Sequence, residues 1–256
     1  MTSTGRRGAH DLGWQGYLDR FHATRSGITE SVFAHLDPRS TGLHDWILDV
    51  VPAEGLVLDV ACGSAPLSRR LEGRWIGLDR VDAELSLARR RDARPLLVGD
   101  ATALPLVGAC VDVVVCSMAL MLLQPLDRAL VELARVLRPG GRFVAVVPDV
   151  TPLTLRDRAR YARLLVALRC RRLEYPNALD RVEGSMRAAG LELVGDERRR
   201  FECVVDRPET ARLVVESLYL PGVDVSCVDR GIGVAQGWVG STIGVPIRRL
   251  VAVRSD

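Results

Sequence analysis

The chain has 256 residues, of which 48% are hydrophobic and 5% aromatic, and a formal net charge of +3. This length and apolar content suit one large α/β domain, and so small a net charge does not by itself imply a polyanion partner. The longest apolar run, residues 113–123, is too short to cross a bilayer, so we expect no membrane span.

The first 51 residues are predicted to form a helical cap. Residues 1–11 are polar and glycine-rich and are expected to be disordered. Helical segments are predicted around residues 17–21, 29–36 and 43–51. The sequence Ser26-Gly-Ile-Thr29 is expected to supply the N-cap of the second segment.

Residues 52–150 alternate between strand and helix signals, which predicts a nucleotide-binding core. Strands are expected at 56–60, 74–79, 95–100, 111–116 and 143–147, with a helix-like stretch at 67–71 and a helix at 125–137. The β-branched run 111–116 is typical of a strand buried on both faces of a parallel sheet. Pro and Gly in residues 138–141 end the second helix.

Residues 151–256 are predicted to contain a lid helix and the closing strands. Helices are expected at 155–173, 178–189 and 208–218, and strands at 191–194, 201–205 and 246–253. Residues 196–200 are expected to break the first two strands, and a glycine-rich stretch leads to residue 244. Because no repeat or linker interrupts the chain, we predict a single domain, 1–256, made of the cap 1–51, the core 52–150 and the C-terminal half 151–256.

The turn after the first strand decides which nucleotide the core would bind. Asp59 and Asp79 end the first two strands, and their spacing fits a strand–turn–helix–strand unit whose second carboxylate meets ribose hydroxyls. A pyrophosphate cradle needs G-x-G-x-x-G, but its three glycine positions fall on Ala61, Gly63 and Pro66. Proline also lacks the N–H that such a cradle would use. A nicotinamide dinucleotide and the oxidoreductases that use it are therefore placed last.

The segment Asp59-Val-Ala-Cys-Gly63-Ser resembles motif I of the class I methyltransferases, and residues 134–141 resemble the helix–turn–strand signature of that family. The resemblance covers residues 56–147. It implies a doubly wound, mostly parallel seven-stranded sheet with helices on both faces, an antiparallel C-terminal hairpin and a helical N-terminal cap. It also implies S-adenosylmethionine as the cofactor. Ala65 stands where the family usually has glycine, from which we expect a shifted or weaker cofactor.

The resemblance assigns the parts of that cofactor to residues of this chain. Its methionine end is expected at Asp59, Ala61 and Gly63, its ribose at Asp79 and its adenine at Asp100 and Ala101. Cys62, Arg80 and Ser117, the last at the end of the fourth strand, are further expected cofactor-binding residues.

Methyl transfer requires alignment and, where the acceptor carries a proton, a base. The sequence does not identify a catalytic residue. His22 is the favoured base because its ordinary pKa suits neutral pH, although a lone histidine is also typical of a helix surface. Further candidates near the mouth of the site are Tyr17, Arg25, Glu30, Met118 and Asp149.

These observations favour a cytoplasmic S-adenosylmethionine-dependent methyltransferase acting on a small molecule, similar to the quinone C-methyltransferases and related small-molecule enzymes.

The six cysteines show no C-x-x-C pair and no interleaved histidine, so we expect a reducing compartment and no metal site. No apolar segment of a signal peptide follows Arg6 and Arg7. The acceptor molecule, the acceptor atom and the oligomeric state are left unassigned.

Two alternatives remain open. An RNA or protein methyltransferase could use the arginine-rich helix 155–173, although this chain has no lysine at all and its arginines fit a coding bias. A non-catalytic S-adenosylmethionine-binding scaffold is the second alternative. The arginines of the helix are Arg156, Arg158, Arg160, Arg163, Arg169, Arg171 and Arg172.

Overall fold

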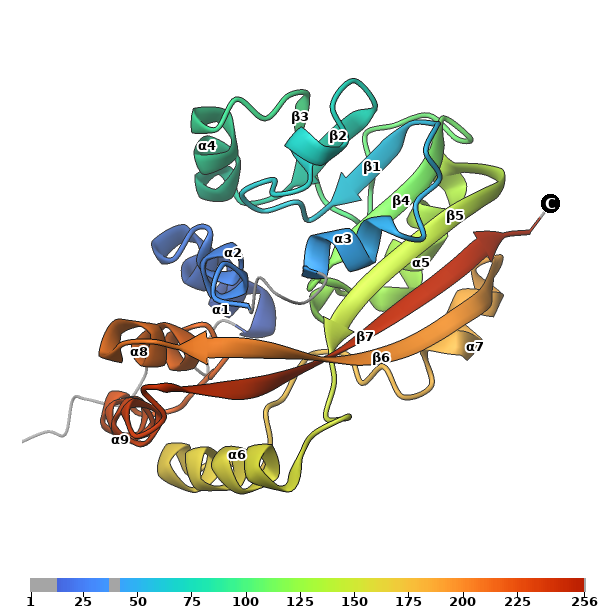
Figure 1. Cartoon of the computed structure of the whole chain (residues 1–256). Helices are drawn as coiled ribbons and strands as arrows, with labels where there is room; N and C mark the ends of the chain where they lie inside the picture. The colour runs from blue at the N-terminus through green and yellow to red at the C-terminus, as the bar shows by residue number, and fades with distance from the viewer. Residues whose placement is uncertain (1–12, 37–41, 256) are drawn as a thin grey trace, which may run out of the picture.

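A mixed seven-stranded sheet runs through the computed structural model, which describes residues 13–36 and 42–255 (Figure 1). The strand order is β3-β2-β1-β4-β5-β7-β6. The first five of these strands are parallel, and β7 pairs antiparallel with both β5 and β6. The predicted sheet with its antiparallel C-terminal pair is confirmed. The strands are β1 (Val57–Val60), β2 (Trp75–Asp79), β3 (Leu96–Val98), β4 (Val111–Ser117), β5 (Leu137–Pro148), β6 (Leu191–Val205) and β7 (Ser241–Arg254).

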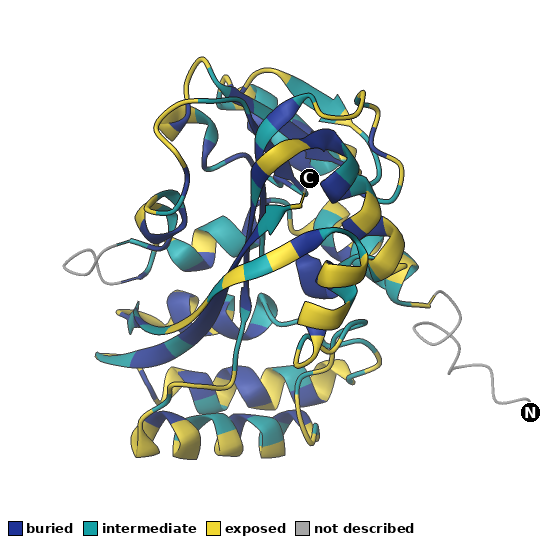
Figure 2. Cartoon of the chain, turned by 90° about the vertical axis from the view of Figure 1, so that its right-hand side faces the viewer, coloured by how far each residue is buried: buried dark blue, intermediate teal, exposed yellow. Residues whose placement is uncertain are grey.

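Helices cover both faces of the sheet, so the central strands are buried on both sides (Figure 2). In β4, Val113 and Val115 pack in one core and Val114 and Cys116 in the other, which is why this strand needs a continuous apolar run. One core includes side chains of α3 (Leu43–Leu48), α4 (Asp82–Arg90), α6 (Leu155–Leu168), α8 (Pro208–Glu216) and α9 (Val225–Gln236). The other includes α5 (Leu126–Val136), the 3₁₀ turn η2 (Leu120–Leu122) and α7 (Val182–Ala188).

The cap consists of α1 (Gly13–Thr24) and α2 (Ile28–Phe33), while α3 leads into the core. Residues 1–11, predicted to be disordered, lie outside the described residues. The predicted N-cap is wrong: Gly27 occupies the N-cap of α2 with a φ of 74° and no side chain caps it. Ser26 instead donates its hydroxyl hydrogen to the carbonyl of His22 at 2.9 Å.

The predicted helix-like stretch at 67–71 is only one 3₁₀ turn, η1 (Ser68–Arg70). Ala65 before it and Gly73 after it both have positive φ, so few residues between them can take helical geometry. The connection from β1 to β2 is therefore nearly all loop.

The C-terminal strands are longer than the sequence predicts. Residues 196–200 do not interrupt β6, because they pair in register with β7 and their acidic side chains meet arginines of that strand. Asp196 contacts Arg248 and Glu197 contacts Arg249, each at 2.8 Å. The glycine-rich stretch also contains a helix, α9, in which Gly231 permits close packing against Leu168 of α6.

The arginine-rich helix ends earlier than predicted, at Leu168, where Arg169 has left-handed geometry with a φ of 56°. Arg169, Arg171 and Arg172 thus lie beyond the helix. Together with α8 and α9, α6 lies along the part of the β6–β7 hairpin that extends past the parallel strands (Figure 1).

The buried carboxylate of Asp157 fixes α6 to the hairpin. It accepts hydrogen bonds from Arg200 Nε and from the Gly244 N–H, each at 2.8 Å, and forms a capping box with Thr154. Burial opposes its ionisation, but these hydrogen bonds prevail and hold the pKa of Asp157 well below its ordinary value.

We predict that Asp157→Ala destabilises the protein by about 3 kcal/mol, because Arg200 loses its buried partner and α6 loses its cap. Urea unfolding followed by circular dichroism measures the change. Asp229→Ala, on the exposed face of α9, is the matched control. If Asp157→Ala lowers the free energy of unfolding by less than about 1 kcal/mol, the contact between Asp157 and Arg200 does not fix α6 to the hairpin.

Candidate functional site

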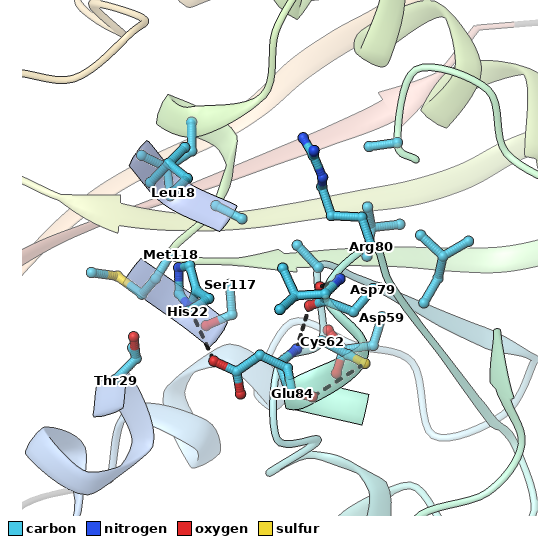
Figure 3. A pocket seen from close by; sticks show the side chains of 18 of the residues that line it. Leu18, His22, Thr29, Asp59, Cys62, Asp79, Arg80, Glu84, Ser117 and Met118 are labelled. Carbon is cyan, nitrogen blue, oxygen red and sulfur yellow. Dashed lines mark hydrogen bonds and ion pairs between the residues drawn. The ribbon is translucent and has the colours of Figure 1, made fainter. Parts of the chain in front are cut away.

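A cavity lies at the carboxyl ends of the parallel strands, under the cap helices α1 and α2 (Figure 3). The carboxyl edge of an open parallel sheet is where such folds bind ligands, because the strand-to-helix loops converge there. The loops that follow β1, β2, β3 and β4 all line this cavity. Residues of the loop segment 61–67, which precedes the 3₁₀ turn η1, form part of the cavity lining.

The loop after β1 is conformationally strained. Ala61, Gly63 and Ala65 all have left-handed backbones, with φ of 56°, 54° and 59°. Glycine adopts this geometry freely, whereas a Cβ atom makes it costly by about 1–2 kcal/mol per residue. Ala61 and Ala65 therefore both occupy backbone positions that favour glycine.

Asp79 connects this loop to β2. Its carboxylate accepts hydrogen bonds from the Gly63 N–H at 2.8 Å and from the Val81 N–H at 2.9 Å. The side chain is buried, and burial raises its pKa above the ordinary value. The two backbone donors hold the carboxylate in place while leaving lone pairs on its oxygens unused.

Asp59 is a second buried carboxylate, only 2% exposed. It accepts a hydrogen bond from Trp75 Nε1 at 3.2 Å. Burial chiefly, with a smaller contribution from the nearby Asp79, raises the pKa of Asp59 to about 7 against the opposing effect of the Trp75 hydrogen bond. Burial also raises the pKa of Cys62 well above its ordinary value, so this thiol lines the cavity as a neutral group and not as a nucleophile.

Glu84 is a third buried carboxylate, and it joins the core to the cap. Its two oxygens accept hydrogen bonds from His22 Nδ1 and from the Gly27 N–H, each at 2.9 Å. The other ring nitrogen, His22 Nε2, lies 3.0 Å from the hydroxyl of Tyr219. Figure 3 shows the side chains of His22 and Glu84 pointing toward one another.

Sequence reasoning missed both Glu84 and Tyr219. Position 84 shares a helix face with the buried Ala88, so helical spacing alone could have indicated that a carboxylate points inward. No local signal indicates Tyr219, which comes from the insertion between β6 and β7.

The structure brings most of the predicted site residues together. Asp59, Ala61, Cys62, Gly63, Asp79, Arg80, Asp100, Ala101 and Ser117, together with His22, Glu30 and Met118, all line the cavity. Sharing one cavity is what the predicted assignments require, but the individual roles of these residues stay predictions.

Tyr17, Arg25 and Asp149 do not line the cavity. The hydroxyl oxygen of Tyr17 accepts a hydrogen bond from the Leu220 N–H at 2.8 Å. Arg25 is exposed and stacks over the Phe21 ring at 5.0 Å. Asp149 pairs with Arg198 at 2.9 Å, so each of the three is engaged in other contacts.

Within the described ranges, no group of three or more His, Cys, Asp or Glu side chains could hold a metal ion. No helix in the described part of the chain is both long and apolar enough to span a membrane.

Comparison with known proteins agrees with this geometry. Residues 58–145 match a family model described as a methyltransferase domain. A malonyl-[acyl-carrier protein] O-methyltransferase of Xylella fastidiosa is 30% identical over 161 residues, which cover 56% of this chain and 54% of that protein. Residues 58–145 thus match a methyltransferase domain, and the chain is similar to the class I methyltransferases. A ubiquinone/menaquinone biosynthesis C-methyltransferase of Dinoroseobacter shibae is 28% identical over 203 residues, which cover 60% of this chain and 80% of that one.

The similarity is strongest in the core. The chain spans between 37% and 54% of the lengths of the malonyl-[acyl-carrier protein] O-methyltransferases that it matches. The solved structure of SpnF, a [4+2]-cyclase, superimposes with a TM-score of 0.61 at 18% identity and covers 93% of this chain and 96% of its own. That likeness concerns the fold alone, and a cyclase with this fold shows that the fold does not by itself determine the reaction.

We predict that Ala65→Gly stabilises the protein by about 0.5–1 kcal/mol, because relief of the left-handed alanine exceeds the entropy that glycine adds to the unfolded chain. Thermal unfolding of the variant and the wild type measures this change in stability. The same substitution at Ala159, exposed on α6, should instead destabilise by about 1 kcal/mol. A destabilising Ala65→Gly would mean that the loop does not hold the observed φ in solution.

Proposed function

We propose that this protein transfers the methyl group of S-adenosylmethionine to a small-molecule acceptor. The observation that carries the proposal is the convergence of three buried carboxylates, Asp59, Asp79 and Glu84, on one cavity at the carboxyl edge of the sheet. S-adenosylmethionine has a sulfonium and an ammonium group against one carboxylate, so it is a net cation. A cavity of this charge fits such a ligand and disfavours a dinucleotide's phosphates.

The residues around the cavity fit the parts of that cofactor. Asp79 has unused lone pairs for the ribose hydroxyls, and Asp59 would face the cationic methionine end. Asp100 and Ala101 would hold the adenine, with Asp100 oriented by hydrogen bonds from the N–H and hydroxyl of Thr102 at 2.8 and 2.7 Å. The absence of a glycine-rich phosphate cradle is consistent with a ligand that has no phosphate.

When bound, the cofactor supplies an electrophilic methyl group on a sulfur atom that leaves readily. The protein's part is to align the acceptor with that methyl group and to exclude water. The cap is held closed over the cavity by polar contacts: Ser64 donates to Glu30 at 2.5 Å, and Arg91 also pairs with Glu30. Such a cap must open to admit its ligands, so loop and cap motion is part of the proposed cycle.

A small acceptor is supported by the shape of the site. The cavity lining also includes apolar side chains, among them Leu18, Phe33 and Leu122. No residue of α6 lines the cavity, so the exposed arginines of that helix have no direct part in it. This favours a small molecule over RNA or a protein. Cytoplasmic localisation stays a prediction from the sequence.

The test of the proposed function is calorimetric titration with S-adenosylmethionine, followed by a search for S-adenosylhomocysteine released with a panel of acceptors. Replacing Asp79 with Ala should weaken cofactor binding by roughly 1.5–3 kcal/mol, because charge-assisted hydrogen bonds to the ribose are lost. Asp127→Ala, exposed on α5, should bind as the wild type does. Absence of binding at millimolar cofactor would refute the proposal, and binding without turnover of any acceptor would favour the scaffold.

We also predict that cofactor binding depends on pH through Asp59. In the free protein its pKa is about 7, and a bound cation would favour the ionised form and lower that value. Between about pH 5 and 7, binding should release up to one proton, and affinity should rise by at most about tenfold per pH unit before levelling off. Calorimetry in buffers of different ionisation enthalpy measures the proton release. If Asp59→Asn releases as many protons as the wild type, Asp59 is not the group responsible.

A further inference from the structure

The cavity is strongly acidic although the chain as a whole carries a net charge of +3. Six acidic residues line it: Asp19, Glu30, Asp59, Asp79, Glu84 and Asp100. Arg80 is the one arginine among its described lining residues, and it pairs with Asp19 at 3.0 Å.

Three of these carboxylates are buried and have no arginine ion-pair partner among the described residues; Asp100 has none either, but it is only half-buried. Among the described residues, neither Asp59 nor Asp79 has an ion-pair partner, and the only one of Glu84 is His22. All three are less than a tenth exposed, so solvent screens them weakly. One bound S-adenosylmethionine adds a single net positive charge, which leaves the cavity negative while these carboxylates are ionised.

This charge discriminates between classes of acceptor. A carboxylate acceptor would bring a further negative charge beside buried carboxylates, and a phenol would acquire one on losing its proton. An amine is bound as a cation, which the same field attracts. An ammonium group has no free lone pair, however, so it must give up a proton before it can be methylated.

The hydrogen-bonded chain Glu84–His22–Tyr219 can take that proton. Because an ionised carboxylate only accepts hydrogen bonds, the contact with Glu84 assigns the hydrogen to His22 Nδ1 and leaves Nε2 as an acceptor. Nε2 then receives the O–H of Tyr219, whose oxygen retains lone pairs. Burial raises the pKa of Tyr219, so its hydroxyl stays protonated and can pass a proton along.

On the basis of the proposed function, we propose that the acceptor is an amine bound as its ammonium ion, and that Tyr219 receives its proton and passes its own to His22. The ammonium N–H gives its proton to the Tyr219 oxygen while the Tyr219 proton moves to His22 Nε2. The freed nitrogen lone pair forms the N–CH₃ bond as the S–CH₃ bond breaks and its electron pair stays on sulfur. One positive charge ends on the methylated ammonium and one on the imidazole, which Glu84 stabilises. Tyr219 is the residue that touches the acceptor; His22 and Glu84 act through it.

Other ionisable groups surround this chain and will shape its pH dependence. Asp79 lies close enough to interact electrostatically with His22, and Tyr17 and Tyr175 interact with Tyr219. Arg25, which directly follows the helix that carries His22, interacts electrostatically with Tyr17.

The first test compares aromatic probes of similar size that carry opposite charges. Protein saturated with S-adenosylhomocysteine is titrated with tyramine and with 4-hydroxyphenylacetate, and in parallel with benzylamine and benzoate. We expect the amine of each pair to bind at least about tenfold more tightly. No preference, a preference for the acid, or no binding by any of the four probes overturns the inference. Failure of S-adenosylmethionine itself to bind would remove the proposed function and the inference together, whereas its binding without amine preference removes the inference alone.

The second test follows the proton, with tyramine as acceptor. Tyr219→Phe should lower kcat about 100-fold near neutral pH while leaving the KM for S-adenosylmethionine nearly unchanged. In that variant, kcat/KM should rise about tenfold per pH unit toward the pKa of the amine, because solvent then does the deprotonation. His22→Gln and Glu84→Gln should show the same rescue by alkaline pH, whereas His35→Gln and Glu183→Gln should match the wild type. The proposed proton transfer is overturned if the loss of activity in these variants does not depend on pH. It is also overturned if the wild type binds tyramine but does not methylate it.

Discussion

The carboxylate of Glu84 is the contact on which the closed site depends. It lies in the core, but both of its oxygens are occupied by the cap, through His22 and the N–H of Gly27. A buried carboxylate without such partners is costly, so the cap and this side chain require each other. The left-handed Gly27 is part of the same arrangement, because its positive φ turns the chain between α1 and α2 and its N–H meets the carboxylate.

Although the chain is rich in arginine, Arg80 is the one arginine among the described residues that line the cavity. Three buried or half-buried arginines serve the C-terminal hairpin: Arg200 meets Asp157, Arg248 meets Asp196 and Arg249 meets Glu197. Those on the outer face of α6 point to solvent. The number of arginines in the sequence therefore says little about the ligand, whereas the buried carboxylates, which are far fewer, define the electrostatics of the site.

The core could be predicted from sequence because its signals are local. A β-branched run such as 111–116 can be satisfied only by a strand buried on both faces, and polar residues at the ends of parallel strands must meet at one edge. The long hairpin could not be predicted, because charged residues such as Asp196 and Glu197 locally indicate the end of a strand. Their partners, Arg248 and Arg249, are distant in sequence. The contact of Tyr219 with His22 joins positions separated by 197 residues, and no short-range pattern records it.

The place of β7 between β5 and β6 sets an order of events during synthesis. The parallel strands and the cap are complete once residues up to about 150 have been made, whereas β6 can join the sheet only through β7, the last strand in sequence. The insertion that carries Tyr219 is held between these two strands, so it is placed only after residues 241–254 have left the ribosome. A nascent chain would therefore assemble the carboxyl edge of its parallel strands well before it could complete the contact between Tyr219 and His22.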